Sequence, residues 1–312
     1  MTKTTGNISQ SGATLVYVAI VCAILVMLAT MIASLVRSQG RQTSDLLARA
    51  SLRDAAESGL FQAVELLLAD TNRVDTLLEP WGRMTADSRE RYDAGENGVF
   101  VFIEDESARL HFQKNGETAF AKVLMITTGQ DADIADSWAR ILYDWQAGFS
   151  GESDNGISGG STNRVFSAEE ELLESPLGGN EAFAAGLRCI TVHGDGKINV
   201  NTVGHDVFVV LAIAQGISPE VAEALFRRLE RARNQGVFFE SIQASEALKV
   251  LPASGSLPSP EERNALLKMQ RFLRVDAACF RILVLARDSA REVGLQTIYD
   301  PRAGQFLRWV PW

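Results

Sequence analysis

The fold is decided near the N-terminus by the stretch ATLVYVAIVCAILVMLATMIASLV, residues 13–36, which contains no charged side chain. At 1.5 Å of rise per residue, about 24 helical residues span a hydrocarbon layer about 30 Å thick. This stretch is longer than the apolar part of an ordinary signal peptide, and no A-x-A-like cleavage site follows it. We therefore expect one membrane-spanning helix that stays in the mature protein and tethers the rest of the chain.

The polar body that follows is about 275 residues long, enough for one large or two small domains. The chain has a formal charge of −9. That charge argues against a body that neutralises phosphates or adheres to an anionic membrane surface, so no nucleic-acid partner is expected. Cys22 lies within the membrane helix, which leaves Cys189 and Cys279 as the possible intramolecular pair. The sequence leaves open whether these two are bridged.

Helical periodicity continues beyond the membrane segment, so we expect one helix from about residue 13 to about residue 70. Two separate helices that meet near Gly40 are the alternative, because a mid-helix glycine costs about 1 kcal/mol relative to alanine. One face of this helix is apolar and is expected to pack both on the protein's own sheet and on partner helices. That face comprises Leu46, Leu47, Ala50, Leu60, Ala63, Val64 and Leu67, with Leu68 at its end.

Strands are expected on both sides of a mostly helical middle region. Residues 99–103 form a short run that is apolar on both faces, which is typical of a buried strand. A tight turn is expected at residues 300–304, between the last two of three C-terminal strands. These three strands are expected at residues 272–287, 293–299 and 305–312. The fold class is therefore α+β: a long N-terminal helix packed on a small antiparallel sheet, with a large helical insertion.

An internal repeat occurs within the insertion, where residues 129–142 match residues 216–229 without a gap. In each copy a glycine ends one helix, and Asp131 or Ser218 is expected to cap the next. A short segment precedes each copy, RLHFQKN at 109–115 and KINVNT at 197–202. The pattern predicts two helix-hairpin-helix-like units. The second glycine of a phosphate-binding turn is missing from both, so a structural use is expected rather than DNA binding.

Taken together, these features resemble the type II secretion system protein K family, the large minor pseudopilins of the general secretion pathway. The resemblance implies a prepilin-type leader that is cut after Gly12, leaving Ala13 as the new N-terminus. Most pseudopilins carry a glutamate at the fifth mature position, where this chain has Tyr17, as is characteristic of K members. Besides the leader and helix, the resemblance rests on IEDESARLHF (103–112), Asp144-Trp145, KINVNT and FLRVDAA (272–278).

The family also implies a division of the chain and a set of partners. The expected parts are a leader (1–12), a transmembrane helix (13–36), a pilin-like helix and first strand (37–112), an inserted helical domain (113–269) and C-terminal strands of the pilin-like sheet (270–312). The implied partners are two smaller minor pseudopilins, the prepilin peptidase and inner-membrane lipid, with the body in the periplasm at the tip of a pseudopilus. The positive-inside rule would instead place the body in the cytoplasm, because Arg37, Arg41, Arg49 and Arg53 follow the helix.

Nothing in the sequence points to an enzyme. His111, His193 and His205 are the only histidines, and none has a metal-ligand spacing or an accompanying nucleophile motif. His205 and Asp206 are expected to cap a helix that begins near Val207. No cofactor is required, although the resemblance suggests calcium. Oxygen donors for calcium are available in the Gly-rich loop at Glu152, Ser153, Asp154 and Asn155, without assigned ligand roles.

A basic run on the second repeat helix, at Arg227, Arg228, Arg231 and Arg233, alternates with glutamates and is expected to form a solvated helix face. Two alternative functions stay open. One is a membrane-anchored DNA receptor that uses the helical hairpins, and the other is a minor subunit of a type IV pilus.

Overall fold

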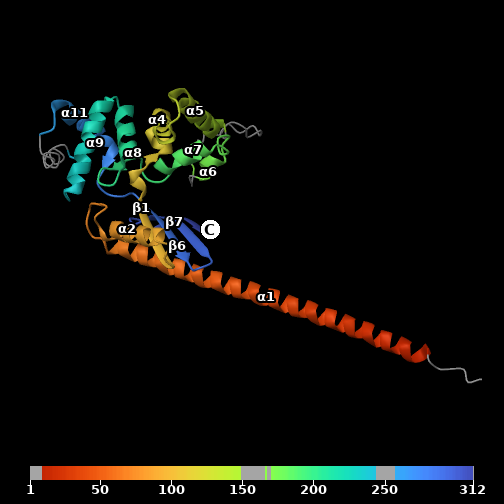
Figure 1. Cartoon of the computed structure of the whole chain (residues 1–312). Coiled ribbons are helices and arrows are strands. Elements are labelled where there is room, and N and C mark those ends of the chain that lie inside the picture. The colour runs from red at the N-terminus through yellow and green to blue at the C-terminus, as the bar shows by residue number, and fades with distance from the viewer. Residues whose placement is uncertain (1–8, 149–165, 167–169, 244–256, 312) are drawn as a thin grey trace, which may run out of the picture. The chain divides into compact units, whose positions relative to one another are not determined.

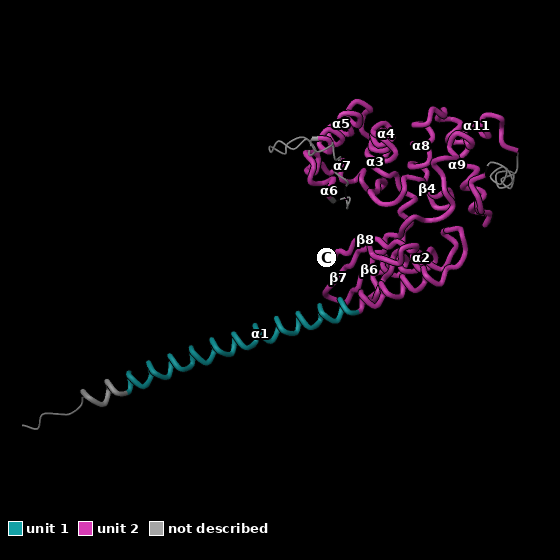
Figure 2. The backbone as a smooth tube through the Cα atoms, turned by 180° about the vertical axis from the view of Figure 1, so that it is seen from behind, with its two compact units in different colours: residues 1–54 teal, residues 55–312 magenta. Residues whose placement is uncertain are grey.

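The computed structural model describes residues 9–148, 166, 170–243 and 257–311 of the chain. These residues form two compact units, Met1–Asp54 and Ala55–Trp312 (Figure 2). The boundary between the units falls within helix α1 (Ser9–Ala69), a single uninterrupted α-helix. The sequence-based expectation of one long helix is therefore confirmed. Gly40 lies inside α1 with no atom within 4 Å of the place where a Cβ would stand, and the helix does not break there.

In the first unit, the described side chains of α1 up to Val36 are exposed, and all of them except those of Thr30 and Ser34 are apolar. The helix contains an 18-residue window with a mean hydropathy of 2.9, and it is the one helix among the described residues that is long and apolar enough to cross a membrane. Exposed apolar side chains are unfavourable in water. The composition of this segment therefore favours a lipid environment.

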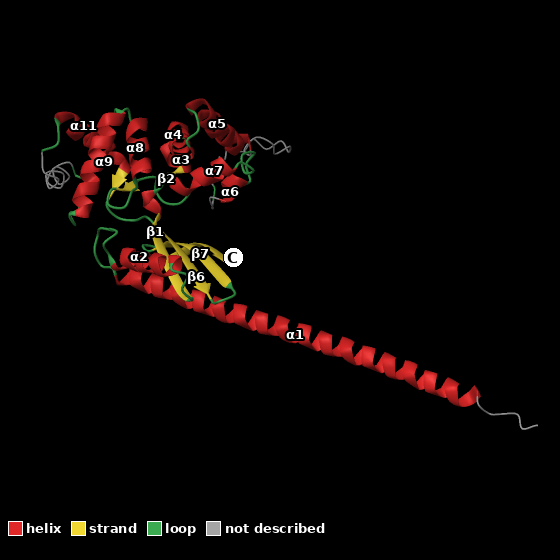
Figure 3. Cartoon of the chain, in the orientation of Figure 1, coloured by secondary structure: helices red, strands yellow, loops and turns green. Residues whose placement is uncertain are grey.

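The second unit contains a four-stranded antiparallel sheet with the strand order β1-β6-β7-β8. Its strands are β1 (Gly98–Asp105), β6 (Phe280–Arg287), β7 (Glu292–Asp300) and β8 (Gln305–Pro311). The neighbours β1 and β6 are separated by more than 170 residues of chain, and Phe102 lies opposite Leu283 in their register. The segment between these two strands forms the helical part of the unit, beside the sheet (Figures 1 and 3).

Both faces of β1 are covered, as its sequence predicts. On one face, α1 approaches so closely that a Cβ on Gly59 would lie 2.8 Å from a methyl group of Val99 and 3.0 Å from one of Val284. On the other face, Tyr92 of helix α2 (Pro80–Asp93) packs edge-on against Phe100 and Phe102. Burial on both faces explains why this strand has no alternation of polar and apolar residues.

The helical part has a core of its own and is built from two similar halves. The first half comprises β2 (Leu110–His111), α3 (Phe112–Asn115), α4 (Glu117–Thr128), α5 (Ala132–Gly148), α6 (Glu170–Leu173), α7 (Glu181–Gly186), η2 (Leu187–Cys189) and β3 (Ile190–Thr191). The second comprises β4 (Ile198–Asn199), α8 (His205–Ala214), α9 (Pro219–Asn234), α11 (Pro260–Met269), η4 (Gln270–Phe272) and β5 (Leu273–Arg274). In each half the first and last strands pair in parallel. The repeat is thus longer than the sequence match indicates.

Each half contains two neighbouring helices joined through a glycine, α4 and α5 in the first half and α8 and α9 in the second. Gly129 between α4 and α5 and Gly216 between α8 and α9 have φ angles of 67° and 73°. Such left-handed backbone is readily adopted only by glycine, which accounts for the residue shared by the two copies. Ser218 caps α9 with its hydroxyl, which accepts a hydrogen bond from the Val221 N–H. The main-chain carbonyl of Asp131 accepts hydrogen bonds from the N–H groups of Ile134 (3.1 Å) and Ala135 (3.0 Å) in α5.

One predicted strand is wrong. Residues 272–287 are not a continuous strand: β5 belongs to a parallel pair with β4, and only β6 belongs to the large sheet. Between β5 and β6, backbone N–H groups donate to side chains from other segments. The Ala277 N–H donates to the Asp75 carboxylate (2.6 Å), and the Ala278 N–H donates to the Ser107 hydroxyl (2.8 Å). A donor that is already satisfied in this way cannot join a strand ladder.

Candidate functional site

The predicted processing site lies at the start of α1. Gly12 and Ala13 are within the helical backbone, whose side chains are described from Leu15 onward. Tyr17, at the position where a glutamate would be usual, is exposed on the apolar segment of the first unit. The suggested calcium donors, residues 152–155, lie outside the described residues.

The structure divides the predicted partner-binding face of α1. Leu46, Leu47 and Ala50 of the first unit are exposed. In the second unit, Leu60 is 0% exposed, Ala63 0% and Leu67 6%, and Val64 is half-buried. The protein's own core covers Leu60, Ala63 and Leu67, so these three side chains are not accessible to a partner helix in this structure.

The sequence reasoning placed Leu68 at the end of the predicted apolar face but missed Phe61, and both residues are exposed. Phe61 and Leu68 remain 59% and 57% exposed in the second unit. They lie seven positions apart on one α-helical face, with Glu65 between them. Large apolar side chains that are exposed together on one face of a helix are typical of a contact surface.

The motif residues of the sequence meet in a buried polar network. Asp105 of the IEDESARLHF segment accepts hydrogen bonds from Asn199 Nδ2 (2.8 Å), Thr202 Oγ1 (2.6 Å) and the Ser107 N–H (2.7 Å). Burial raises the pKa of Asp105 to about 6, although these hydrogen bonds act in the opposite direction. Asn199 and Thr202 belong to KINVNT. These two motifs therefore join the sheet to the helical part, which is a structural role.

Glu106, the next residue, anchors a second part of this junction. Its carboxylate is 2.6 Å from the Arg281 guanidinium of β6 and 3.8 Å from that of Arg109, and it accepts a hydrogen bond from Thr191 of β3. Burial would raise the pKa of Glu106, but the two guanidiniums outweigh burial and lower it. Breaking either of these buried ion pairs would leave an uncompensated charge.

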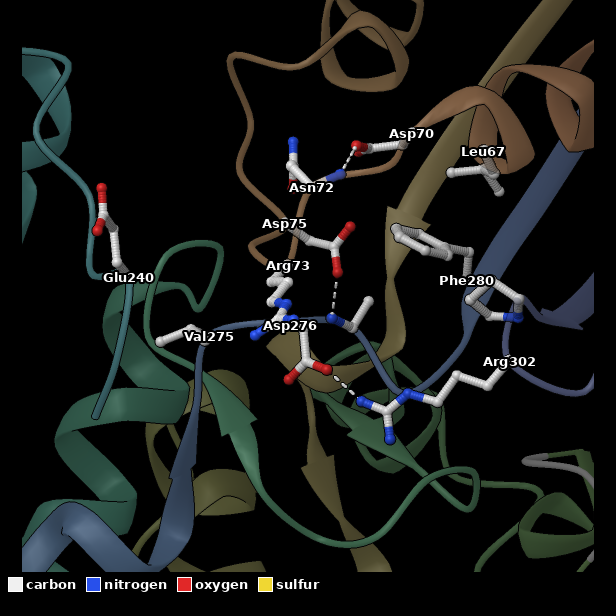
Figure 4. A pocket seen from close by; sticks show the side chains of 12 residues that line it. Leu67, Asp70, Asn72, Arg73, Asp75, Glu240, Val275, Asp276, Phe280 and Arg302 are labelled. Atoms are coloured by element: carbon white, nitrogen blue, oxygen red, sulfur yellow. Dashed lines mark hydrogen bonds and ion pairs between the residues drawn. The ribbon is translucent and has the colours of Figure 1, made fainter. Parts of the chain in front are cut away.

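A pocket of about 550 Å³ opens beside this junction, within the second unit (Figure 4). Its wall carries Asp70 and Asp75, and together with Glu79 these residues can place one carboxylate oxygen each within 4.8 Å of one another. Oxygen donors grouped in this way suit a hard cation such as calcium. The sequence reasoning missed this group. Its three acids are close in sequence, within residues 70–79, but their proximity in space depends on the turn that follows α1.

The electrostatics of this acidic group follow from burial and mutual repulsion. Burial raises the pKa of Asp75 to about 6, and the neighbouring carboxylates of Asp105 and Asp70 add to the shift. Burial and Asp70 raise the pKa of Glu79 to about 7, against the hydrogen bond that Trp81 Nε1 donates to it at 2.7 Å. Carboxylates held this close favour a bound proton or cation at neutral pH.

Two of the three histidines have identifiable structural roles. His111 caps α3, and its Nδ1 accepts from the N–H groups of Gln113 (3.2 Å) and Lys114 (3.4 Å). The expected cap at His205 and Asp206 is wrong, because α8 begins at His205 itself and Gly204 is its N-cap. His205 instead bonds Asp206 through Nδ1 (2.9 Å) and Glu223 of α9 through Nε2 (3.0 Å). These hydrogen bonds raise the pKa of His205.

The basic run on α9 is only partly a solvated face, which corrects the sequence-based expectation. Arg228 forms a 2.8 Å ion pair with Glu262 of α11, and both side chains are largely buried. Arg233 donates to the carbonyls of Val203 (2.8 Å) and Val200 (2.5 Å). Arginines that hold α9 against its own neighbours are not available to neutralise a phosphate backbone.

Cys22, Cys189 and Cys279 are all free thiols in the structure.

No model of a known protein family matches the sequence, and no curated protein matches it either. Among solved structures, the chain is similar to a chain in "The Crystal Structure of the GspK-GspI-GspJ complex from enterotoxigenic Escherichia coli Type 2 Secretion System". The TM-score is 0.52 at 12% sequence identity, over 88% of this chain and 98% of that chain. The two chains share a fold, which confirms the expected α+β architecture and agrees with the resemblance that the sequence motifs indicate.

Proposed function

We propose that this chain is a minor pseudopilin of a type II secretion system. It is held in the inner membrane by α1, with its body in the periplasm. The observation that carries the proposal is the fold shared with a chain of the GspK-GspI-GspJ complex, over 98% of that chain. A second support is independent of that likeness, because α1 is long and apolar enough to cross a bilayer. A protein of this kind acts by association, and its chemistry lies in its surfaces.

Within such an assembly, the chain is proposed to cap the tip of the pseudopilus and help to start its growth. A carboxylate buried in lipid is costly without a partner, so a subunit with no neighbour above it gains nothing from one. Tyr17 stands where that carboxylate would be. The helical part between β1 and β6 also makes the body bulky, which opposes repetitive stacking.

The surface proposed to contact partner helices is the exposed face of α1. In the second unit it consists of Phe61, Glu65 and Leu68, and in the first unit of Leu46, Leu47 and Ala50. If a partner buried these residues, the Phe61 and Leu68 side chains would each contribute about 1.5–3 kcal/mol of transfer free energy. The partners proposed are two smaller minor pseudopilins.

The N-terminal residue of the mature membrane protein tests the proposed processing. Mass spectrometry of the terminal peptide should find Ala13 at the start of the chain, and the variant Gly12→Leu should retain Met1 or its neighbour. Gly40→Leu is the matched control, because Gly40 lies in the same helix with free space around it. A wild-type start at Met1 would contradict prepilin-type processing and favour a plain membrane anchor.

Co-purification with the two smaller pseudopilins tests the association itself. Full-length chain should retain both partners, and Phe61→Glu should weaken that retention at least tenfold. Leu267→Glu, on the exposed face of α11, should leave it unchanged. Salt-sensitive binding of duplex DNA without co-purification would favour the DNA-receptor alternative. That alternative has little support here, because Arg228 and Arg233 are engaged within the helical part.

A further inference from the structure

Four arginines of α1 follow its apolar segment, and their surroundings divide them into two pairs. Arg49 lies 3.3 Å from the carboxylate of Asp45, one turn before it, and Arg53 also interacts within the chain. Arg37 and Arg41 are exposed, and no hydrogen bond or ion pair within the described residues engages either guanidinium. The two arginines nearest to the apolar segment therefore have no counter-charge in the described part of the chain.

The distance from the end of the apolar segment separates the same two pairs. Because α1 is continuous through this region, a rise of 1.5 Å per residue places Arg37 about 1.5 Å and Arg41 about 7.5 Å beyond Val36, and Arg49 about 20 Å beyond it. The headgroup layer of a bilayer is about 5–8 Å thick on each side of the hydrocarbon core. With residues 13–36 in the hydrocarbon, Arg37 and Arg41 thus lie among the headgroups, and Arg49 lies outside them.

Arg37 and Arg41 are also placed to act together. They are four positions apart, so their Cβ atoms lie about 5–6 Å from each other on one face of the helix. A guanidinium can donate two parallel hydrogen bonds to the oxygens of a phosphate. Residues 37–44 contain these two arginines and no acidic residue, in a chain of net charge −9. This turn is therefore locally basic, although the chain as a whole is acidic.

Continuity with the membrane segment decides which occupant fits. The helix that holds residues 13–36 in hydrocarbon holds Arg37 and Arg41 at the depth of the lipid phosphates. With the body in the periplasm, these arginines lie on the side of the membrane that the positive-inside rule disfavours, and a counter-charge would offset that disadvantage. A zwitterionic headgroup brings a cation of its own, so a headgroup with net negative charge complements the arginines better.

We propose that Arg37 and Arg41 form a binding site for the headgroup phosphate of an anionic phospholipid, such as phosphatidylglycerol, beside the body. Each arginine at the surface of an anionic membrane contributes about fivefold to such binding. The inference rests on the proposed function, because it takes α1 to be a retained membrane helix with the body in the periplasm. It goes beyond that function by naming a lipid class and the two residues that recognise it.

Native mass spectrometry of the full-length chain in a neutral detergent tests the site, with phosphatidylglycerol and phosphatidylcholine supplied in equal amounts. Bound phosphatidylglycerol should exceed bound phosphatidylcholine at least about tenfold. Excess inorganic phosphate should not displace it, since the acyl chains hold the lipid beside α1. Equal binding of the two lipids would overturn the proposal. Displacement by inorganic phosphate would overturn it too, because a free anion would then be the occupant.

Two double variants that each remove two positive charges separate position from net charge. Arg37→Gln with Arg41→Gln should reduce the lipid preference to less than about twofold, and Arg49→Gln with Arg53→Gln should leave it unchanged. Equal losses in the two double variants, or a preference that survives the first, would overturn the site.

A partner's carboxylate is the other occupant that the experiment can detect. If the variant with Arg37→Gln and Arg41→Gln keeps the lipid preference but no longer co-purifies with the two smaller pseudopilins, the arginines bind a partner and the lipid site is wrong. The lipid measurement uses the chain alone, so its failure is distinguishable from failure of the proposed function. An absent lipid preference in a chain that begins at Ala13 and retains its partners would overturn the lipid site only.

Discussion

Protonation of His111 should destabilise the body, and the structure sets the size of the effect. The ring is 3% exposed and caps α3 through an unprotonated Nδ1. Burial, with smaller contributions from Lys114 and His193, lowers the pKa of His111 to about 4, from 6.5. The unfolded chain therefore binds the proton more tightly between these two values. Stability is present above pH 6.5 and is lost as the pH falls toward 4.

The loss can be isolated with the variant His111→Asn, which keeps a capping acceptor and cannot be charged. A shift of this size corresponds to about 3 kcal/mol in full, of which about 2 kcal/mol is lost between pH 7 and pH 5. Between pH 7 and pH 5, the difference in unfolding free energy between wild type and variant should change by about 2 kcal/mol, to the disadvantage of the wild type. Urea denaturation of the full-length chain in detergent, followed by tryptophan fluorescence, measures it at both pH values.

The comparison with a variant is needed because other groups act in the opposite direction. Burial raises the pKa values of Asp75, Asp105 and Glu79, so their contributions to stability increase on acidification. His205→Asn is the control, because hydrogen bonds raise the pKa of His205. The unfolding free energy of the wild type relative to this variant should therefore be higher at pH 5 than at pH 7. A difference for His111→Asn that does not change with pH would refute the reasoning.

Three further predictions concern packing. Gly59→Leu should lower the unfolding free energy by about 3 kcal/mol, as measured by urea denaturation, because a Cβ alone would already lie 2.8 Å from a valine methyl group; an unchanged value would show that α1 does not press on the sheet there. Leu60→Glu should destabilise the body by about 3–5 kcal/mol, and Phe61→Glu by less than about 0.5 kcal/mol, so thermal unfolding separates a core residue from a surface one. Asp105→Leu leaves three buried donors without an acceptor and should cost about 3 kcal/mol or more, with faster proteolysis of residues 192–203; a wild-type digestion pattern would count against the network as the junction.

Much of the fold could be predicted because its signals are local. The apolar stretch at residues 13–36 needs no neighbour to be recognised, and the run at 99–103 reads as a strand from composition alone. The hairpin turns at Gly129 and Gly216 were predictable for the same reason, since a left-handed turn selects glycine wherever it occurs.

The candidate site was less predictable, because its contacts join distant segments. Arg228 reaches Glu262, 34 residues away, and Asp105 reaches Asn199, 94 residues away. The three acids of residues 70–79 are close in sequence, but only the turn after α1 brings their oxygens together. No periodicity or spacing rule connects such pairs.

The sequence by itself determined the long apolar helix, the glycine turns between paired helices and the α+β class, because each depends on side-chain patterns within one element. Only the tertiary structure decided which residues of α1 are core and which are surface. Leu60 and Phe61 are adjacent and equally apolar, yet one is fully buried and the other 59% exposed. Helical geometry points neighbouring side chains about 100° apart, and the position of the sheet then selects which of them leaves water.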